Sequence, residues 1–289
     1  MKKHQKAILY ALLAALLYAI SSPFSKMLLN KIHPALLASL LYLGAGIGLS
    51  GVAFIQRSYL ISTQEKQLSK KEFPYILGMI LLDILAPILM MIGLNLTTAA
   101  NASLLNNFEI VATSIIALVF FKEKISPKLW LAIFLVTISS IILSIEDAHS
   151  FSFSLGSFFV VMACTCWGLE NNFTRRLSSK NPLQIVIIKG FGAGFGSLLI
   201  AIMVGDLFVD HQYILIALLV GFLAYGLSIF FYVTAQRDLG ASRTSAYYAF
   251  SPFLGTALSL LIFKQIPSIP FLVAFMIMLI GAYLVYSDH

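Results

Sequence analysis

The chain has 289 residues, of which 60% are hydrophobic and 11% are charged, and its mean hydropathy is +0.93. Soluble globular domains carry about 25% charged residues, so this composition excludes a soluble globular fold and predicts a polytopic membrane protein. At about 20 residues per membrane-spanning helix, the length allows roughly ten helices and leaves no room for a soluble domain.

Apolar runs separated by charged or Pro/Gly/Asn-containing turns predict ten transmembrane helices, in an all-α fold. The first five are predicted over residues 7–29, 34–56, 74–95, 99–121 and 128–146. The second five are predicted over residues 154–174, 183–204, 213–235, 241–263 and 269–287.

The distribution of lysine and arginine between the predicted loops sets the orientation. Of the nineteen basic residues, fifteen fall on the side that carries both termini, three fall on the opposite side, and Lys189 lies inside a helix. The positive-inside rule therefore places both termini in the cytoplasm, with the protein in the cytoplasmic (inner) membrane. The formal charge of +7 follows from this topology and predicts no nucleic-acid partner.

The two halves of the chain resemble each other weakly. Phe24-Ser25-Lys26 returns as Phe173-Thr174-Arg175, the glycine-rich segment 44–48 returns as 192–196, and Phe121-Lys122 returns as Phe263-Lys264. We therefore predict one integral membrane unit made of two five-helix repeats, residues 1–147 and 148–289. Because five is odd, the repeats enter the membrane from opposite sides and are inverted, an arrangement typical of alternating-access transporters.

Polar residues interrupt the apolar sequence most densely between Trp167 and Gly196. Glu170, Asn171, Asn172 and Lys189 lie there, and a charge at the bilayer centre costs about 2.5–3.5 kcal/mol on insertion scales. Glu170 and Lys189 have nearly matching depths in adjacent antiparallel helices. We expect them to pair beside the two amides in a water-accessible cavity that handles a small solute. The alternative is a structural ion pair, and Trp167 fits a cavity wall or a core position equally well.

A second set of polar positions follows one face of two symmetry-related helices. Ala102, Asn106, Glu109 and Thr113 share a face of helix 99–121, and a shift of 142 places Thr244, Tyr248, Ser251 and Gly255 on the matching face of helix 241–263. We expect the two stripes to face each other across a cavity, with Asn106, Glu109 and Tyr248 contacting substrate. Tight packing through small residues is the alternative.

Asp83 lies near the middle of helix 74–95, four residues before Pro87. A proline inside a helix leaves a carbonyl without its hydrogen bond, so Asp83 is either a local partner for this carbonyl or a proton-binding carboxylate.

The remaining reactive side chains argue against metal or cofactor chemistry. Cys164 and Cys166 are two positions apart in one helix, so they point to different faces and are predicted to be packing residues. All five histidines fall at predicted helix ends or in loops. We predict no metal site, no cofactor and no catalytic residues.

Taken together, the chain resembles the ten-helix EamA branch of the drug/metabolite transporter superfamily over its whole length. The resemblance rests on the 5+5 repeat, on the segment Phe120–Pro127 with its glutamate Glu123, and on Gly240-Ala241-Ser242 with Gly281. Gln265 replaces the glutamate in the second half. The resemblance implies cytoplasmic termini, a central cavity lined partly by the predicted helices 99–121 and 241–263, and movement of amino acids or other small metabolites, often outward.

We therefore expect a secondary transporter that moves a small metabolite, an amino acid or a related compound, by alternating access and in the outward direction. Proton-coupled uptake and efflux of cationic drugs are the alternatives, and a channel or an intramembrane enzyme is more remote. No phosphate-binding loop occurs, so a solute or proton gradient has to supply the energy. Membrane lipid and a small solute are the expected partners, and proton coupling and a homodimer stay open.

Overall fold

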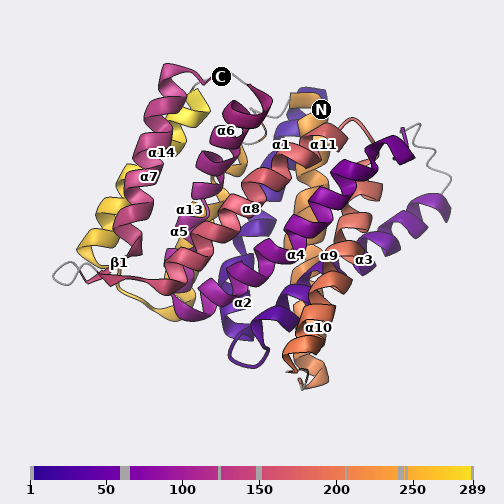
Figure 1. Ribbon diagram of the computed structural model, residues 1–289, viewed down its shortest axis with the longest axis horizontal. Coiled ribbons are helices and arrows are strands. Elements are labelled where there is room, and N and C mark those ends of the chain that lie inside the picture. The colour runs from indigo at the N-terminus through magenta and orange to yellow at the C-terminus, as the bar shows by residue number, and fades with distance from the viewer. Residues whose placement is uncertain are drawn as a thin grey trace.

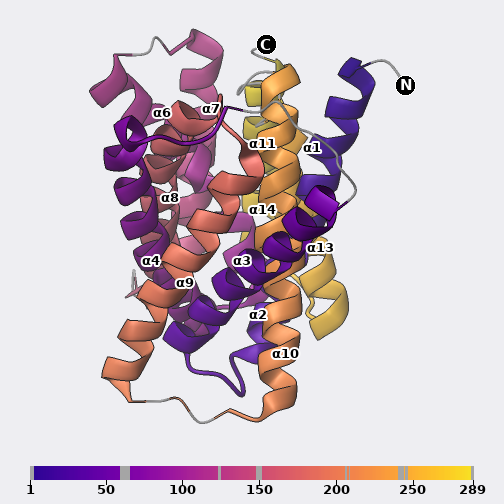
Figure 2. The ribbon, with the colours of Figure 1, turned by 90° about the vertical axis from the view of Figure 1, so that its right-hand side faces the viewer.

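The computed structural model describes residues 3–58, 66–122, 125–147, 152–205, 207, 209–239, 244 and 247–287. Its helices run side by side in a bundle, and the start of α1 and the end of α14 lie at the same end of this bundle (Figures 1 and 2). Within the described residues, eight helical segments are long and apolar enough to cross a membrane. The predicted all-α membrane fold is confirmed.

The first half contains seven α-helices and one 3-10 helix in the described residues. They are α1 (Lys3–Ala19), α2 (Ser21–Leu28), α3 (Pro34–Ser58), η1 (Lys70–Glu72), α4 (Phe73–Leu96), α5 (Ala99–Leu105), α6 (Phe108–Phe121) and α7 (Pro127–Ser144). Two predicted helices are each divided in the structure. Helix 7–29 breaks at Ile20, three residues before Pro23, and helix 99–121 breaks at Asn106 and Asn107.

The second half begins after a small antiparallel strand pair, β1 (Ile145–Asp147) and β2 (Ser152–Phe153). The prediction of a helix to residue 146 was therefore wrong at its end, because the last two residues join this pair. Next come α8 (Leu155–Leu177), α9 (Pro182–Val204), α10 (His211–Val220), the π-helix η2 (Gly221–Leu227), α11 (Ser228–Leu239), α13 (Ser251–Phe263) and α14 (Ile269–Ser287).

Several helix ends have clear local causes. Asn181 precedes Pro182, and its side-chain oxygen accepts hydrogen bonds from the backbone N–H groups of Leu183 (2.9 Å) and Gln184 (3.2 Å), which caps α9. Lys122 and Lys264 end α6 and α13 in the left-handed conformation, with φ of 55° and 49°. The Phe-Lys pair that returns along the sequence thus ends a helix in each half.

Glycines allow the helix backbones to approach closely around α3. A Cβ on Gly44 would collide with the backbone of Leu218 in α10, and one on Gly221 would collide with the backbone of Leu41. Gly192 and Gly196 of α9 instead face Ile80 and Ile84 of α4. These glycines therefore serve close helix packing, and α4 packs along both α8 and α9.

Candidate functional site

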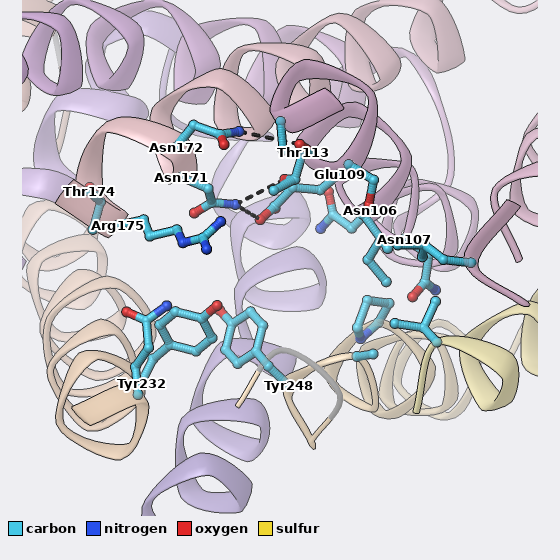
Figure 3. A pocket seen from close by; sticks show the side chains of 18 of the residues that line it. Asn106, Asn107, Glu109, Thr113, Asn171, Asn172, Thr174, Arg175, Tyr232 and Tyr248 are labelled. Carbon is cyan, nitrogen blue, oxygen red and sulfur yellow. Dashed lines mark hydrogen bonds between the residues drawn. The ribbon is translucent and has the colours of Figure 1, made fainter. Parts of the chain in front are cut away.

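A cavity of about 220 Å³ lies between two walls of the bundle (Figure 3). One wall is formed by α6 and α8, and the other by α11 and the segment 247–252. Its polar lining comprises Tyr18, Asn106, Asn107, Glu109, Thr113, Ser114, Asn171, Asn172, Thr174, Arg175, Tyr232, Gln236 and Tyr248.

Amide and carboxyl groups form the wall of α6 and α8. The Nδ2 atom of Asn171 donates to Glu109 Oε1 at 2.6 Å, so that the amide orients the carboxylate toward the cavity. Asn172 Nδ2 donates to the backbone oxygens of Gly168 (2.8 Å) and Thr113 (3.3 Å). Asn172 therefore holds α8 against α6 beside the cavity (Figure 3).

Tyrosines form the facing wall. The rings of Tyr232 and Tyr248 meet edge to face, with centroids 4.9 Å apart, and Tyr18 lies 5.6 Å from Tyr248. In Figure 3, Tyr232 and Tyr248 lie opposite Asn171 and Glu109. The cavity thus has an aromatic wall across from a hydrogen-bonding wall.

The helix break at Asn106 and Asn107 places two amides at the deep end of this cavity. Both are buried, with exposed fractions of 6% and 1%. Asn107 Nδ2 donates to the carbonyl of Leu104 at 3.2 Å, whereas its Oδ1 has no hydrogen-bond partner among the described residues. Gln236 Oε1, in the opposite wall, is likewise without one in this part of the chain. Both oxygens can accept a hydrogen bond from a bound solute.

The lining of the cavity reaches one end of the bundle. Ile125 lies between α6 and α7, and Arg175 and Gln236 lie two and three residues before the ends of α8 and α11. At the other end α5 packs against α13: Ser103 Oγ donates to the carbonyl of Pro252 at 3.0 Å, and Thr256 Oγ1 donates to the carbonyl of Ala100 at 3.3 Å. This contact closes the bundle beyond the cavity.

A buried ionic cluster lies next to the cavity, between α4, α8 and α9. Lys189 Nζ is 3.1 Å from Glu170 Oε1 and 3.2 Å from Asp83 Oδ2. Tyr42 of α3 donates its hydroxyl to Asp83 Oδ1 at 2.9 Å, and Thr174 donates its hydroxyl to Glu170 Oε1. The two carboxylates and the ammonium are at most 6% exposed.

The sequence matches the EamA-like transporter family twice, over residues 5–145 and 154–287. The chain belongs to the EamA-like transporter family. It is therefore a membrane transporter within the drug/metabolite transporter superfamily, and the resemblance noted from the sequence is confirmed.

Other comparisons agree with membership of the EamA-like family. An uncharacterized transporter from Methanothermobacter thermautotrophicus (strain Delta H) is 27% identical over 287 residues, which cover 94% of this chain and 84% of that protein. One solved crystal structure superposes with a TM-score of 0.71 at 16% identity, covering 98% of this chain and 96% of that one. At this identity the second likeness concerns the fold alone.

The EamA-like motifs quoted from the sequence are only partly visible in the structure. Glu123 and the segment 240–242 lie outside the described residues. Gly281 lies in α14, where a Cβ would contact Val136 of α7.

The region Trp167–Gly196 follows the sequence predictions only in part. Glu170 and Lys189 pair as predicted, and neither of them lines the cavity described above. The cluster faces α4, because the helix rotation that directs Asn171 to the cavity turns the preceding residue, Glu170, toward Asp83. Thr174, one turn after Glu170, lies between the cavity and the cluster. Trp167 is 6% exposed and belongs to the hydrophobic core.

Asp83 is neither exposed to the cavity nor a partner for the carbonyl that Pro87 leaves free. Its two oxygens contact Tyr42 and Lys189 instead. A sequence shows which helix carries a carboxylate, but the partners here come from residues 41 positions before and 106 positions after it. These partners follow from how α3, α4 and α9 pack.

The two predicted polar stripes meet over only part of their length. Asn106, Glu109, Thr113 and Tyr248 line the cavity. Ser251 and Gly255 do not, because α13 packs against α5 at the closed end, where a Cβ on Gly255 would collide with Ser103 Oγ.

Several lining residues were missed from the sequence. Tyr232, Gln236 and Arg175 lie near predicted helix ends, where polar residues are common, so their type and position alone gave no signal. Asn107 was hidden by the assumption of one uninterrupted helix, although two adjacent asparagines are unfavourable inside a helix.

Among the described residues, no group of three His, Cys, Asp or Glu side chains is placed to hold a metal ion.

Proposed function

We propose that this protein is a secondary transporter that exports a small zwitterionic metabolite, an amino acid or a related compound, by alternating access. The observation that carries the proposal is a polar cavity whose lining reaches the helix ends on one side of the bundle, while α5 packs against α13 on the other side. Alternating access requires a central site that reaches one side of the membrane at a time.

The closed end is held by contacts that can separate. Two hydroxyl-to-carbonyl hydrogen bonds and one glycine contact join α5 to α13, and none of these involves an ion pair. Because α5 and α13 lie in different halves of the chain, a rocking motion of one half against the other would open this end. The 5+5 inverted repeat predicted from the sequence supplies the symmetry for such a motion.

The cavity lining suits a molecule with an ammonium and a carboxylate. Glu109, Asn107 Oδ1 and Gln236 Oε1 are acceptors for the N–H groups of an ammonium. Arg175 extends toward the space between the two walls and offers a guanidinium that can bind a carboxylate in bidentate fashion (Figure 3). A volume of about 220 Å³ is below the roughly 300 Å³ lower limit of drug-sized pockets, which favours a small metabolite.

We propose export as the direction of transport. Fifteen basic residues on the side of the termini support a cytoplasmic orientation of that side. The cavity lining reaches the helix ends on the same side, where a metabolite made in the cell could enter it.

The test is counterflow of labelled solutes in proteoliposomes, with amino acids, polyamines, nucleosides and cationic dyes as the panel. We expect a zwitterionic amino acid to be exchanged, and Glu109→Gln and Arg175→Gln each to abolish this exchange. Glu72→Gln is the matched control, since Glu72 pairs with Lys180 outside the cavity at 3.1 Å. Full exchange by both cavity variants, or no exchange of any zwitterion by the wild type, would refute the proposal.

Efflux of cationic compounds is the second candidate, and the tyrosine wall favours it. Tyr18, Tyr232 and Tyr248 face Glu109, and aromatic faces beside a carboxylate bind organic cations by cation–π attraction. The same panel separates the candidates: exchange of a cationic dye that needs Glu109 but not Arg175 would favour efflux of cations.

A further inference from the structure

The buried cluster of Asp83, Glu170 and Lys189 has unequal numbers of positive and negative groups. Two carboxylates contact one ammonium, and among the described residues no other cation is paired with either carboxylate. If both carboxylates are ionised, the cluster carries one uncompensated negative charge. Asp83 is 0% exposed and Glu170 2% exposed, so water does not solvate this charge.

An uncompensated charge inside the bundle is unfavourable, and one bound proton removes it. We propose that this cluster is a proton-binding site, separate from the solute cavity, and that its proton drives export by the transporter proposed above. In the reaction, one carboxylate of the cluster takes a proton from a hydronium ion. One O–H bond of the hydronium ion breaks, one carboxyl O–H bond forms, a water molecule is released, and the charge of the cluster changes from −1 to 0.

The proton can reach the cluster from the cavity. Thr174 lines the cavity and donates its hydroxyl to Glu170, so that one side chain joins the two sites. A hydroxyl that contacts both water and a carboxylate can relay a proton between them. Asp83 lies on the far side of Lys189 and is stabilised by the hydroxyl of Tyr42.

The cluster and the solute site are also linked to each other. Asn171, the neighbour of Glu170 in α8, holds Glu109 at 2.6 Å, and the charge of Glu109 interacts with those of Glu170 and Lys189. A positive group bound at Glu109 therefore disfavours a proton at the cluster, and a proton disfavours the solute. Such competition is what an exchange of solute for proton requires.

The cluster is placed where a change of charge can move helices. Asp83 belongs to α4 in the first family match, whereas Glu170 and Lys189 belong to α8 and α9 in the second. Protonation weakens the attraction that holds these helices together. The charge of the cluster is thus coupled to the contact between the two halves.

Three other titratable groups face the cluster from the elements packed around it. Tyr42 lies in α3, Tyr225 of η2 has its ring centroid 5.3 Å from that of Tyr42, and Glu109 lies in α6. A phenol ordinarily titrates near pH 10, so both tyrosines stay neutral in the physiological range. Glu109 is the one competing carboxylate, and the test has to separate it from the cluster.

The test is an infrared difference titration of the purified full-length protein in nanodiscs, which follows the C=O stretch of protonated carboxyl groups without any solute. We expect wild type and Glu109→Gln to share a band that Asp83→Asn loses, because Asp83→Asn leaves a neutral Glu170–Lys189 pair. Glu170→Gln should lose the band as well and serves as the second variant if Asp83→Asn does not fold. A band retained in both cluster variants, or lost in Glu109→Gln, would overturn the proposal.

A second measurement tests the coupling and separates it from the proposed function. A proton gradient should drive accumulation of the exchanged solute in wild-type proteoliposomes, and Asp83→Asn should lose this accumulation. Glu72→Gln should keep it. If wild type exchanges no solute while the infrared band is present, only the transport proposal fails. If wild type exchanges a solute but the band is missing, only the proton site fails.

Discussion

Lys189 is expected to be the most sensitive cation of the protein. Replacing it by methionine keeps the length of the side chain but leaves Asp83 and Glu170 buried without their shared partner. Removing one partner of a buried ion pair costs about 3–5 kcal/mol, because the remaining charge is uncompensated.

This cost predicts a large change in melting temperature. For domains of 150–250 residues, 1 kcal/mol corresponds to a shift of about 2–4 °C, and the lower figure applies to a larger chain, so Lys189→Met should lower the apparent melting temperature by about 6–10 °C. Intrinsic tryptophan fluorescence in detergent can follow the transition, since Trp167 is buried three residues before Glu170.

Two further variants test whether the uncompensated buried charge causes the loss of stability. Lys180→Met removes an ion pair of the same length, 3.1 Å to Glu72, but in a more exposed position, and should change the melting temperature little. Combining Lys189→Met with Asp83→Asn and Glu170→Gln removes every charge of the cluster and should restore most of the loss. Equal shifts for the two single lysine variants, or no recovery in the triple variant, would refute the account of the cluster.

Three other predictions concern packing and a helix-end hydrogen bond. Gly255→Val places a side chain against Ser103 at the contact between α5 and α13, so it should favour opening of that end. In alternating access the opposite end then closes, so a cysteine introduced at Gln236 should react less with maleimide. Lys26→Met removes the donor that contacts the carbonyls of three residues at the end of α4 at 2.7–2.9 Å, and should cost about 1–2 kcal/mol after discounting its partial exposure, measured by melting temperature. Gly221→Val should cost at least about 1–3 kcal/mol through overpacking against α3, whereas the same change at Gly51, which has open space, should cost much less on the same assay.

The sequence alone determined the features that depend on local composition. Long apolar runs predict helices because backbone polar groups in a bilayer must be satisfied within the segment, and the described spans follow these runs closely. The match in depth between Glu170 and Lys189 likewise follows from helix geometry, since only a short turn separates their helices. The pair forms at 3.1 Å.

The tertiary structure alone decided which polar groups meet the cavity and which are buried. Helices in a membrane are apolar on nearly every side, so their sequences do not reveal how each is rotated about its axis. The rotation of α8 puts Asn171 in the cavity and Glu170 beside Asp83, although the two residues are adjacent in the chain. The break at Asn107 and the joining of Asp83 to Lys189 depend on contacts between segments far apart in sequence, which no local pattern contains.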